Sequence, residues 1–263
     1  MGENWQSNVE EWCRAYVQTT SLALKLEPPK VPAEWQESPQ SLRIDLPGRP
    51  SELRVVKYSK KSSGGDPLRS APKRIALMHT FLHHELQAAE LMAWAILAFP
   101  ETPIEFRRGL LGILHDELRH MRLYGDYLTA HGVKFGDLTI RDWFWERVPL
   151  CKSPVEFVSL LGIGFEGGNL DHATRFQERF RDAGDEAAVR VQEIVGREEV
   201  AHVRFAIHWF SKWAGEFEFS RWREHLPPPL SPLVMRGKPI CHEARKRAGF
   251  SPEFVAQLEA WNS

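Results

Sequence analysis

Two short motifs in this sequence place a carboxylate and an imidazole at helical spacing. Each motif reads Glu-x-x-His, with Glu117 before His120 and Glu199 before His202. Residues three apart in a helix lie on one face, with Cβ atoms about 5–6 Å apart, so each pair presents its two side chains to a common point. Carboxylate oxygens and imidazole nitrogens are ligands for divalent metal ions. Both motifs are therefore candidate parts of a metal site.

A further glutamate precedes each motif at nearly the same distance. Glu85 precedes Glu117 by 32 residues, and Glu166 precedes Glu199 by 33 residues. A repeated spacing of this kind is typical of an internal duplication. The sequence thus predicts two similar halves related by a pseudo-two-fold axis.

Four long amphipathic helices are expected to carry these residues, over about 72–98, 103–131, 154–181 and 185–214. On each inner face, apolar residues recur at intervals of three and four, interrupted by the candidate ligands. Thr102 is expected to cap the second helix, and Ser251 is expected to cap a short helix near the C-terminus. Short connections join the first helix to the second and the third to the fourth, whereas the long stretch 132–152 joins the middle pair. This connectivity predicts an all-α fold, a ferritin-like four-helix bundle with one long crossover.

Terminal segments flank the expected bundle. Residues 1–71 are expected to form an N-terminal helix near 7–25 and a proline-rich wrapping segment, and residues 215–263 a C-terminal extension packing on the bundle. The bundle itself would occupy 72–214. The stretch 54–74 is rich in Lys and Arg, which indicates either a solvated basic loop or a contact with RNA or another anionic substrate.

Composition restricts the classes of partner and compartment. The sequence has 34 Lys and Arg against 35 Asp and Glu, so no global field would draw it to nucleic acid or an anionic membrane. Three cysteines, odd in number and far apart, fit a reducing compartment. The N-terminus has no signal-peptide pattern, and the longest apolar run, Leu91 to Phe99, is too short to span a membrane. We therefore expect a cytoplasmic protein without a membrane partner.

Four inward-facing glutamates would place up to four negative charges in a bundle interior. Each buried carboxylate costs several kcal/mol unless a positive charge compensates it. Two divalent cations would balance the four carboxylates, and the two imidazoles complete six ligands, the established pattern of di-iron and di-manganese carboxylate bundles. The predicted metal ligands are Glu85, Glu117, His120, Glu166, Glu199 and His202. Iron suits this site, with manganese or a mixed iron–manganese pair as alternatives.

Several neighbouring residues are candidates for supporting roles. Asp116 and Glu198 each directly precede a ligand glutamate and could accept a hydrogen bond from a ligand imidazole. Tyr124 lies one turn beyond the first ligand histidine and is either a core tyrosine or a redox-active phenol beside the metals. We take these three as candidate catalytic residues. Glu90 follows Glu85 by five residues, and Asp171 follows Glu166 by five. Each of these two acids is either a surface charge or an outer partner of the site.

These residues also carry a family resemblance. The run Asp116–His120 resembles the Asp-Glu-x-Arg-His motif of bacterial di-iron monooxygenases and related ferritin-like proteins. The stretches 83–91, 164–172 and 198–202 together resemble a ferritin-like bacterial family of unknown function that is related to the di-iron tRNA hydroxylase modifying isopentenyl-type adenosines. The likeness runs from about 70 to 215 and implies the same six metal ligands.

A site of this kind indicates redox chemistry. Two reducible ions about 3.5–4 Å apart can bind O₂ and share electrons, while the protein holds their geometry and excludes water. We therefore expect a di-iron oxidoreductase, an oxidase or monooxygenase, that uses O₂ on a small-molecule or nucleoside-type substrate and draws on an electron donor. A ferroxidase or metal storage protein is one alternative, and a non-enzymatic scaffold with a structural metal pair is the other.

Overall fold

The computed structural model describes residues 5, 7–57 and 67–262 of the chain. Within these residues the regular structure is helical, and the only β-type pairing is an isolated bridge between Val55 and Ile140. The predicted all-α class is therefore confirmed. The chain forms two compact units, Met1–Pro149 and Leu150–Ser263. Among the described residues, none of the helices combines the length and apolar character that crossing a membrane requires.

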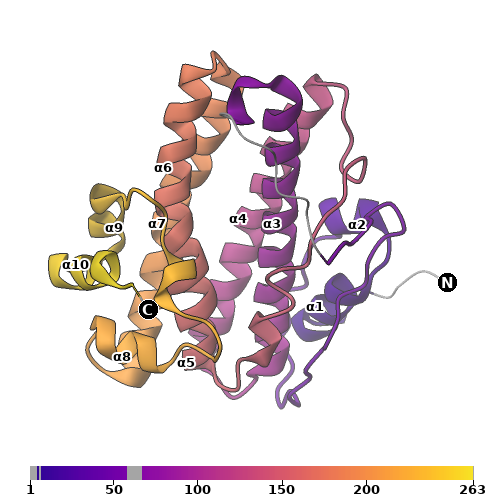
Figure 1. Cartoon of the computed structure of the whole chain (residues 1–263). Helices are drawn as coiled ribbons and strands as arrows, with labels where there is room; N and C mark the ends of the chain where they lie inside the picture. Colours follow the sequence, from indigo (N-terminus) through magenta and orange to yellow (C-terminus); the bar gives the residue numbers. More distant parts are fainter. Residues whose placement is uncertain (1–4, 6, 58–66, 263) are drawn as a thin grey trace. The chain divides into compact units, whose positions relative to one another are not determined.

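The first unit is built on a long helical hairpin, α3 (Ala71–Ala98) and α4 (Ile104–Ala130), drawn in Figure 1. A short 3-10 turn, η1 (Pro67–Arg69), leads into α3. Pro72 in the first turn of α3 suits a position whose backbone N–H would have no helical acceptor. Helix α1 (Val9–Gln18) packs on α3, and α2 (Leu22–Leu26) packs on α4. The N-terminal segment thus covers the hairpin that carries three of the predicted ligands.

Two details of the first unit differ from expectation. The helix predicted near 7–25 is interrupted, because α1 ends at Gln18 and the side chain of Ser21 accepts a hydrogen bond from the Leu24 N–H to begin α2. The predicted cap at Thr102 is wrong, since its hydroxyl donates to the Phe99 carbonyl at 2.7 Å and Pro103 holds the cap position. Much of the basic stretch 54–74, namely 58–66, lies outside the described residues.

Gly48 lies where the backbone of the N-terminal segment passes close to the end of α1. Its N–H donates to the Val17 carbonyl at 2.8 Å, and an added Cβ would overlap the carbonyl oxygen of Gln18. We expect Gly48→Ala to lower the free energy of unfolding by about 3 kcal/mol, because backbone atoms cannot make way as a flexible side chain can. Urea denaturation checks this result. Gly112→Ala is the control, since a Cβ there meets nothing within 4 Å and should add about 1 kcal/mol of helix stability; equal effects at both sites would contradict the packing argument.

The second unit is built on a helix pair whose first member changes its winding. The first member runs from α5 (Pro154–Phe157) through a π-helical segment, η3 (Val158–Glu166), into α6 (Gly167–Asp182). It pairs with α7 (Glu186–Ala214), and η2 (Val148–Leu150) precedes α5. The predicted range 154–181 is close to the observed one, but the π winding is a feature that amphipathic periodicity does not reveal. π-helical turns occur frequently at functional sites.

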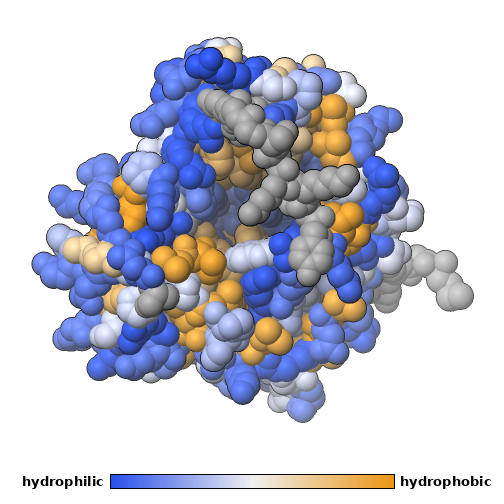
Figure 2. Space-filling view, in the orientation of Figure 1, coloured by the Kyte–Doolittle hydropathy of each residue, from blue (hydrophilic) through white to orange (hydrophobic). Residues whose placement is uncertain are grey.

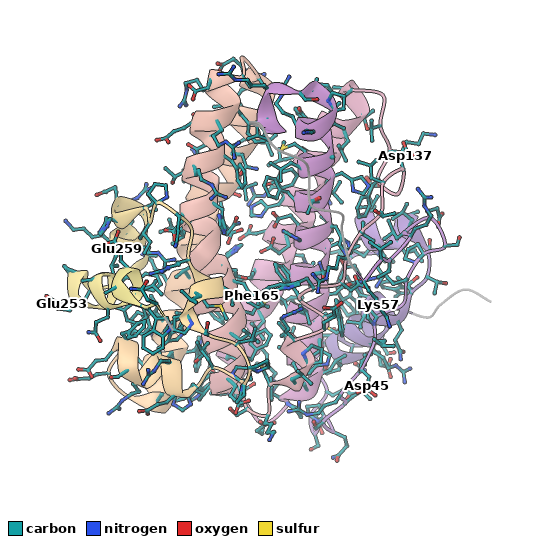
Figure 3. The ribbon with its side chains drawn as sticks, in the orientation of Figure 1. Asp45, Lys57, Asp137, Phe165, Glu253 and Glu259 are labelled. Atoms are coloured by element: carbon teal, nitrogen blue, oxygen red, sulfur yellow. The ribbon has the colours of Figure 1, made fainter. Side chains whose placement is uncertain are left out.

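The C-terminal extension consists of four short helices, α8 (Phe219–Glu224), η4 (Pro232–Met235), α9 (His242–Ala248) and α10 (Pro252–Ala260). Helix α9 packs on α6 and α7, and η4 packs on η3. Ser251 caps α10 as predicted, accepting from the Phe254 N–H at 3.1 Å. Glu253 and Glu259 point outward from α10 in Figure 3. The visible surface over the upper part of α6 is largely hydrophilic in Figure 2, as expected for an amphipathic helix.

Candidate metal centre

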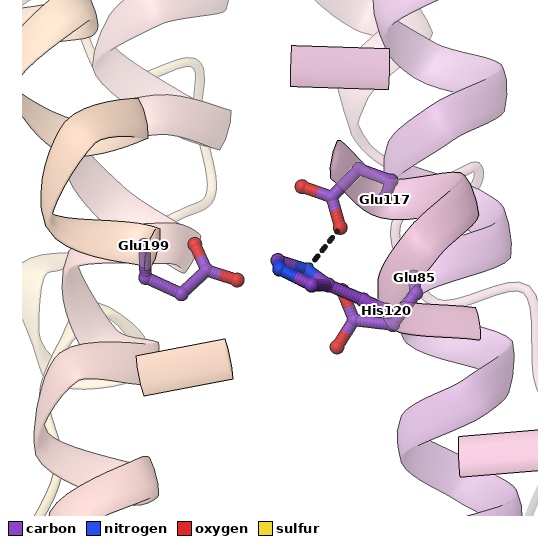
Figure 4. Close-up of side chains that lie close together, drawn as sticks. All are labelled: Glu85, Glu117, His120 and Glu199. Atoms are coloured by element: carbon purple, nitrogen blue, oxygen red, sulfur yellow. Dashed lines mark hydrogen bonds and ion pairs between the residues drawn. The ribbon is translucent and has the colours of Figure 1, made fainter. Parts of the chain in front are cut away.

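The first unit brings three predicted ligands together. Glu85 lies on α3, and Glu117 and His120 lie one turn apart on α4; their ligand atoms are all within 4.8 Å of one another. His120 Nδ1 is 3.3 Å from Glu117 Oε2 and 3.6 Å from Glu85 Oε2 (Figure 4). All three residues are at most 5% exposed. The arrangement is therefore a buried cluster of two carboxylates and one imidazole.

Electrostatics in this cluster favour the binding of positive charge. Burial, followed by the neighbouring charge of Glu117, raises the pKa of Glu85 well above its usual range. Burial alone would lower the pKa of His120, but hydrogen bonds and attraction to Glu117 and Glu85 raise that pKa to about 11. In the absence of a cation the cluster therefore retains protons that offset its carboxylate charge. A bound metal ion would replace those protons.

The second unit holds the matching residues. Glu166 is the last residue of η3, and Glu199 and His202 lie one turn apart on α7. His202 Nδ1 is 3.4 Å from Glu199 Oε2, and Glu166 and His202 offer ligand atoms within 4.8 Å of one another. These three residues are at most 6% exposed. Each unit thus contains two buried glutamates and a buried histidine in the same order along the chain.

One supporting residue in the second unit was not predicted. The amide of Asn169 on α6 donates to Glu199 Oε1 at 3.2 Å and so ties that carboxylate to the neighbouring helix. Asn169 follows Glu166 by three residues, the same spacing that identified the Glu-x-x-His pairs. That spacing is the signal that could have found it.

The candidate catalytic residues occupy different environments. Asp116 forms an ion pair with Arg119 at 2.7 Å, and its side chain is 40% exposed. Glu198 is half-buried on α7 directly before Glu199. Tyr124 is 2% exposed, and its ring centroid lies 5.9 Å from that of Phe81. Their roles in supporting or completing a metal centre stay predictions.

Glu90, considered above as a possible surface charge, is fully buried in ion pairs. Its carboxylate lies 2.6 Å from Lys25 Nζ and 2.7 Å from Arg49 Nη1, and it accepts a hydrogen bond from the Trp145 indole at 2.7 Å. Burial would raise the pKa of Glu90, but Arg49 and Lys25 outweigh burial and lower that pKa. The surface interpretation is therefore wrong, because the N-terminal segment supplies two cations that the periodicity of α3 cannot indicate.

Asp171, the corresponding residue of the second unit, is buried in the same way. Its side chain is 0% exposed and lies 2.7 Å from Arg245 Nη2. It also accepts hydrogen bonds from the backbone N–H groups of Gly237 and Cys241 at 2.8 and 2.9 Å. The surface interpretation is wrong here too. In both units the acid five residues beyond the first ligand glutamate fastens a terminal segment to the helix.

Asp142 extends the ion-pair network of the first unit. It accepts from Arg49 Nε at 2.9 Å and lies 3.0 Å from His83 Nε2. Burial would raise its pKa, but hydrogen bonds with His83 and Arg49 lower that pKa from 3.8 to about 2.

A depressed folded-state pKa makes Asp142 a source of acid-dependent stability. Its contribution is fully present above pH 3.8 and is lost as the pH falls from about 4 to about 2. We expect Asp142→Asn to cost about 2 kcal/mol at pH 6 and little at pH 2. Denaturant midpoints measured across this pH range check the result. A loss that does not change with pH would contradict the ion-pair account.

The fold and the clusters define the class of protein: an all-helical protein whose buried carboxylate and histidine groups could bind metal ions. The chain belongs to the family described as "Protein of unknown function (DUF455)", which matches residues 5–256. It is also similar to an "Uncharacterized protein" of Haemophilus influenzae, with 26% identity covering 55% of this chain and 57% of that protein. The chain therefore spans little more than half the length of that relative. No solved structure matches the chain.

Proposed function

We propose that this chain is a dinuclear metalloprotein of ferritin-like architecture. Its ligands would be the six buried residues that the two units contribute in the same order, Glu85, Glu117 and His120 with Glu166, Glu199 and His202. The observation that carries the proposal is this repetition. A single Glu-x-x-His pair is common in helices, whereas two copies, each preceded by a buried glutamate at a matching spacing, fit the established donor set of dinuclear carboxylate bundles.

The donor chemistry fits two divalent first-row metals. Four carboxylates and two imidazoles supply hard oxygen and borderline nitrogen ligands, which suit iron or manganese. Four buried negative charges also need compensation, which two divalent ions provide. The raised pKa values of Glu85 and His120 support this, because the protons on these groups supply positive charge that a bound cation would otherwise supply.

We further propose that the bound metals are iron and that the protein is an oxidase or hydroxylase acting on a small-molecule or nucleoside-type substrate in the cytoplasm. Iron would supply a reducible centre for O₂. The chain's own residues would hold the ions and, because they are buried, keep bulk water from the site. The six side chains would hold the two ions, and the electrons for O₂ reduction would come from a separate donor.

Oxygen uptake by the iron-loaded protein tests this function. Protein loaded with Fe(II) under anaerobic conditions should consume O₂ after mixing with aerated buffer, as measured with an oxygen electrode. Glu117→Ala should abolish the uptake, whereas Glu105→Ala, an exposed glutamate on the same helix, should leave it unchanged. A storage protein would instead take up many irons per chain and elute as a large shell. A scaffold would bind metal without metal-dependent O₂ uptake, and either result would contradict the proposal.

A further inference from the structure

The C-terminal extension closes tightly on the residues that flank Glu166. Glu166 ends the π-helical segment η3, and Gly167 begins α6. A Cβ added at Gly164 would lie 2.6 Å from Met235 Sδ, and one at Gly167 would lie 3.4 Å from the Phe250 ring. Side chains of the extension therefore touch the backbone on both sides of the junction between π and α winding.

A buried ion pair fastens the extension at this place. Arg245 donates to the Asp171 carboxylate through Nε at 3.0 Å and Nη2 at 2.7 Å, and Nη2 also donates to the Met235 carbonyl at 3.1 Å. The two side chains are 1% and 0% exposed. The Arg245 guanidinium also lies 4.9 Å from the centroid of the Phe250 ring. Arg245 thus links α6 to both residues that press on the junction.

The position of the junction determines where Glu166 points. Residues of a π-helix, with i→i+5 hydrogen bonds, are rotated by a smaller angle per residue than those of an α-helix, so moving the change in winding along the chain would rotate the Glu166 side chain about the helix axis. We propose that Arg245 and Asp171 are positioning residues, which hold the π-to-α junction in place and thereby orient the Glu166 carboxylate. The inference rests on the proposed function, since it takes Glu166 to be a ligand of the metal centre.

The first unit carries an independent counterpart of this buried ion pair. Glu90 lies five residues beyond Glu85, as Asp171 lies five beyond Glu166, and it is buried against Lys25 and Arg49 of the N-terminal segment. The two terminal segments are unlike in sequence, yet the first places two cations and the second places one on the acid at the same position of the repeat. Because the acid keeps the same position in both halves while the terminal segments differ, we attribute its role to the helix that carries the ligand glutamate.

Hydrogen exchange of the metal-free protein tests the positioning role without requiring metal. Arg245→Gln should accelerate exchange of the amides of residues 162–168 by about ten-fold or more, because the junction opens more readily. Asp171→Asn, which is nearly isosteric, should do the same. Arg236→Gln is the matched control, since Arg236 is a buried arginine of the same extension whose hydrogen bonds go to carbonyls at the end of α10. It should change exchange at 162–168 by less than about two-fold.

A second readout follows the proposed metal ligand itself. In the cobalt-loaded protein, the visible ligand-field spectrum should change in Arg245→Gln and Asp171→Asn, stay as in the wild type in Arg236→Gln, and recover in part in Arg245→Lys, which keeps the charge. Equal acceleration of exchange by Arg245→Gln and Arg236→Gln, or no acceleration by the first, would overturn the positioning role even if metal binds. Failure of the wild type to bind metal would instead contradict the proposed function. The exchange experiment would still test the positioning role, because it uses the metal-free protein.

Discussion

Replacing Glu90 with Gln is expected to lower the free energy of unfolding by about 3–5 kcal/mol at neutral pH. The substitution removes the carboxylate that Lys25 and Arg49 share, and leaves two buried or nearly buried cations facing a neutral amide. Losing one member of a buried ion pair is costly because the remaining charge stays desolvated. Chemical denaturation followed by far-ultraviolet circular dichroism measures the loss.

Two further variants show whether the cost comes from the uncompensated cations. Glu105→Gln, an exposed position on α4, should change stability by no more than about 0.5 kcal/mol. Adding Lys25→Met to Glu90→Gln should recover part of the loss, since an apolar side chain replaces a buried cation that has lost its counter-charge. A loss below about 1 kcal/mol for Glu90→Gln alone would show that the network contributes little to folding.

Glu117→Gln is expected to affect the metal-loaded protein much more than the metal-free protein. Without metal, the variant should differ from the wild type by no more than about 1 kcal/mol, because Glu85, whose pKa Glu117 helps to raise, can ionise and take over the ion pair with His120. With metal at about 100 times its dissociation constant, the wild type should gain about 3 kcal/mol and the variant almost nothing. Thermal and denaturant unfolding with and without metal measure both differences.

The contrast between the two states is what identifies a binding site. Substituting a residue that serves only packing would destabilise the protein whether or not metal is present. If added metal stabilises variant and wild type equally, Glu117 does not act as a ligand.

Local pattern was enough to predict the helices and the pairing of ligands along them. The spacing of Glu117 and His120 is a property of one helix, and so is the apolar stripe on which they lie, so both could be predicted without knowledge of the tertiary structure. The structure confirms the helical class and places Glu85 beside this pair. The same local reasoning predicted the cap at Ser251 correctly and the cap at Thr102 wrongly, because the Thr102 hydroxyl bonds to the preceding turn instead.

The features that sequence reasoning missed depend on residues distant in the chain. Glu90 and Asp171 interrupt no apolar stripe, and their burial depends on Lys25, Arg49 and Arg245, which come from the terminal segments. The π winding of η3 likewise gives no periodic signal of its own, and contacts such as that of Met235 with Gly164 become visible only in the folded chain. Charge and close packing between remote segments therefore account for most of what the sequence could not predict.

Metal stoichiometry tests the central claim most directly. Metal-free protein titrated anaerobically with Fe(II) or Co(II), then freed of excess ion and analysed for bound metal, should hold two ions per chain. Glu117→Ala and Glu199→Ala, one variant from each repeated half, should each reduce that number, whereas Glu105→Ala should retain two. Absence of tightly bound metal in the wild type, or two ions retained by both ligand variants, would contradict a dinuclear centre built from these residues.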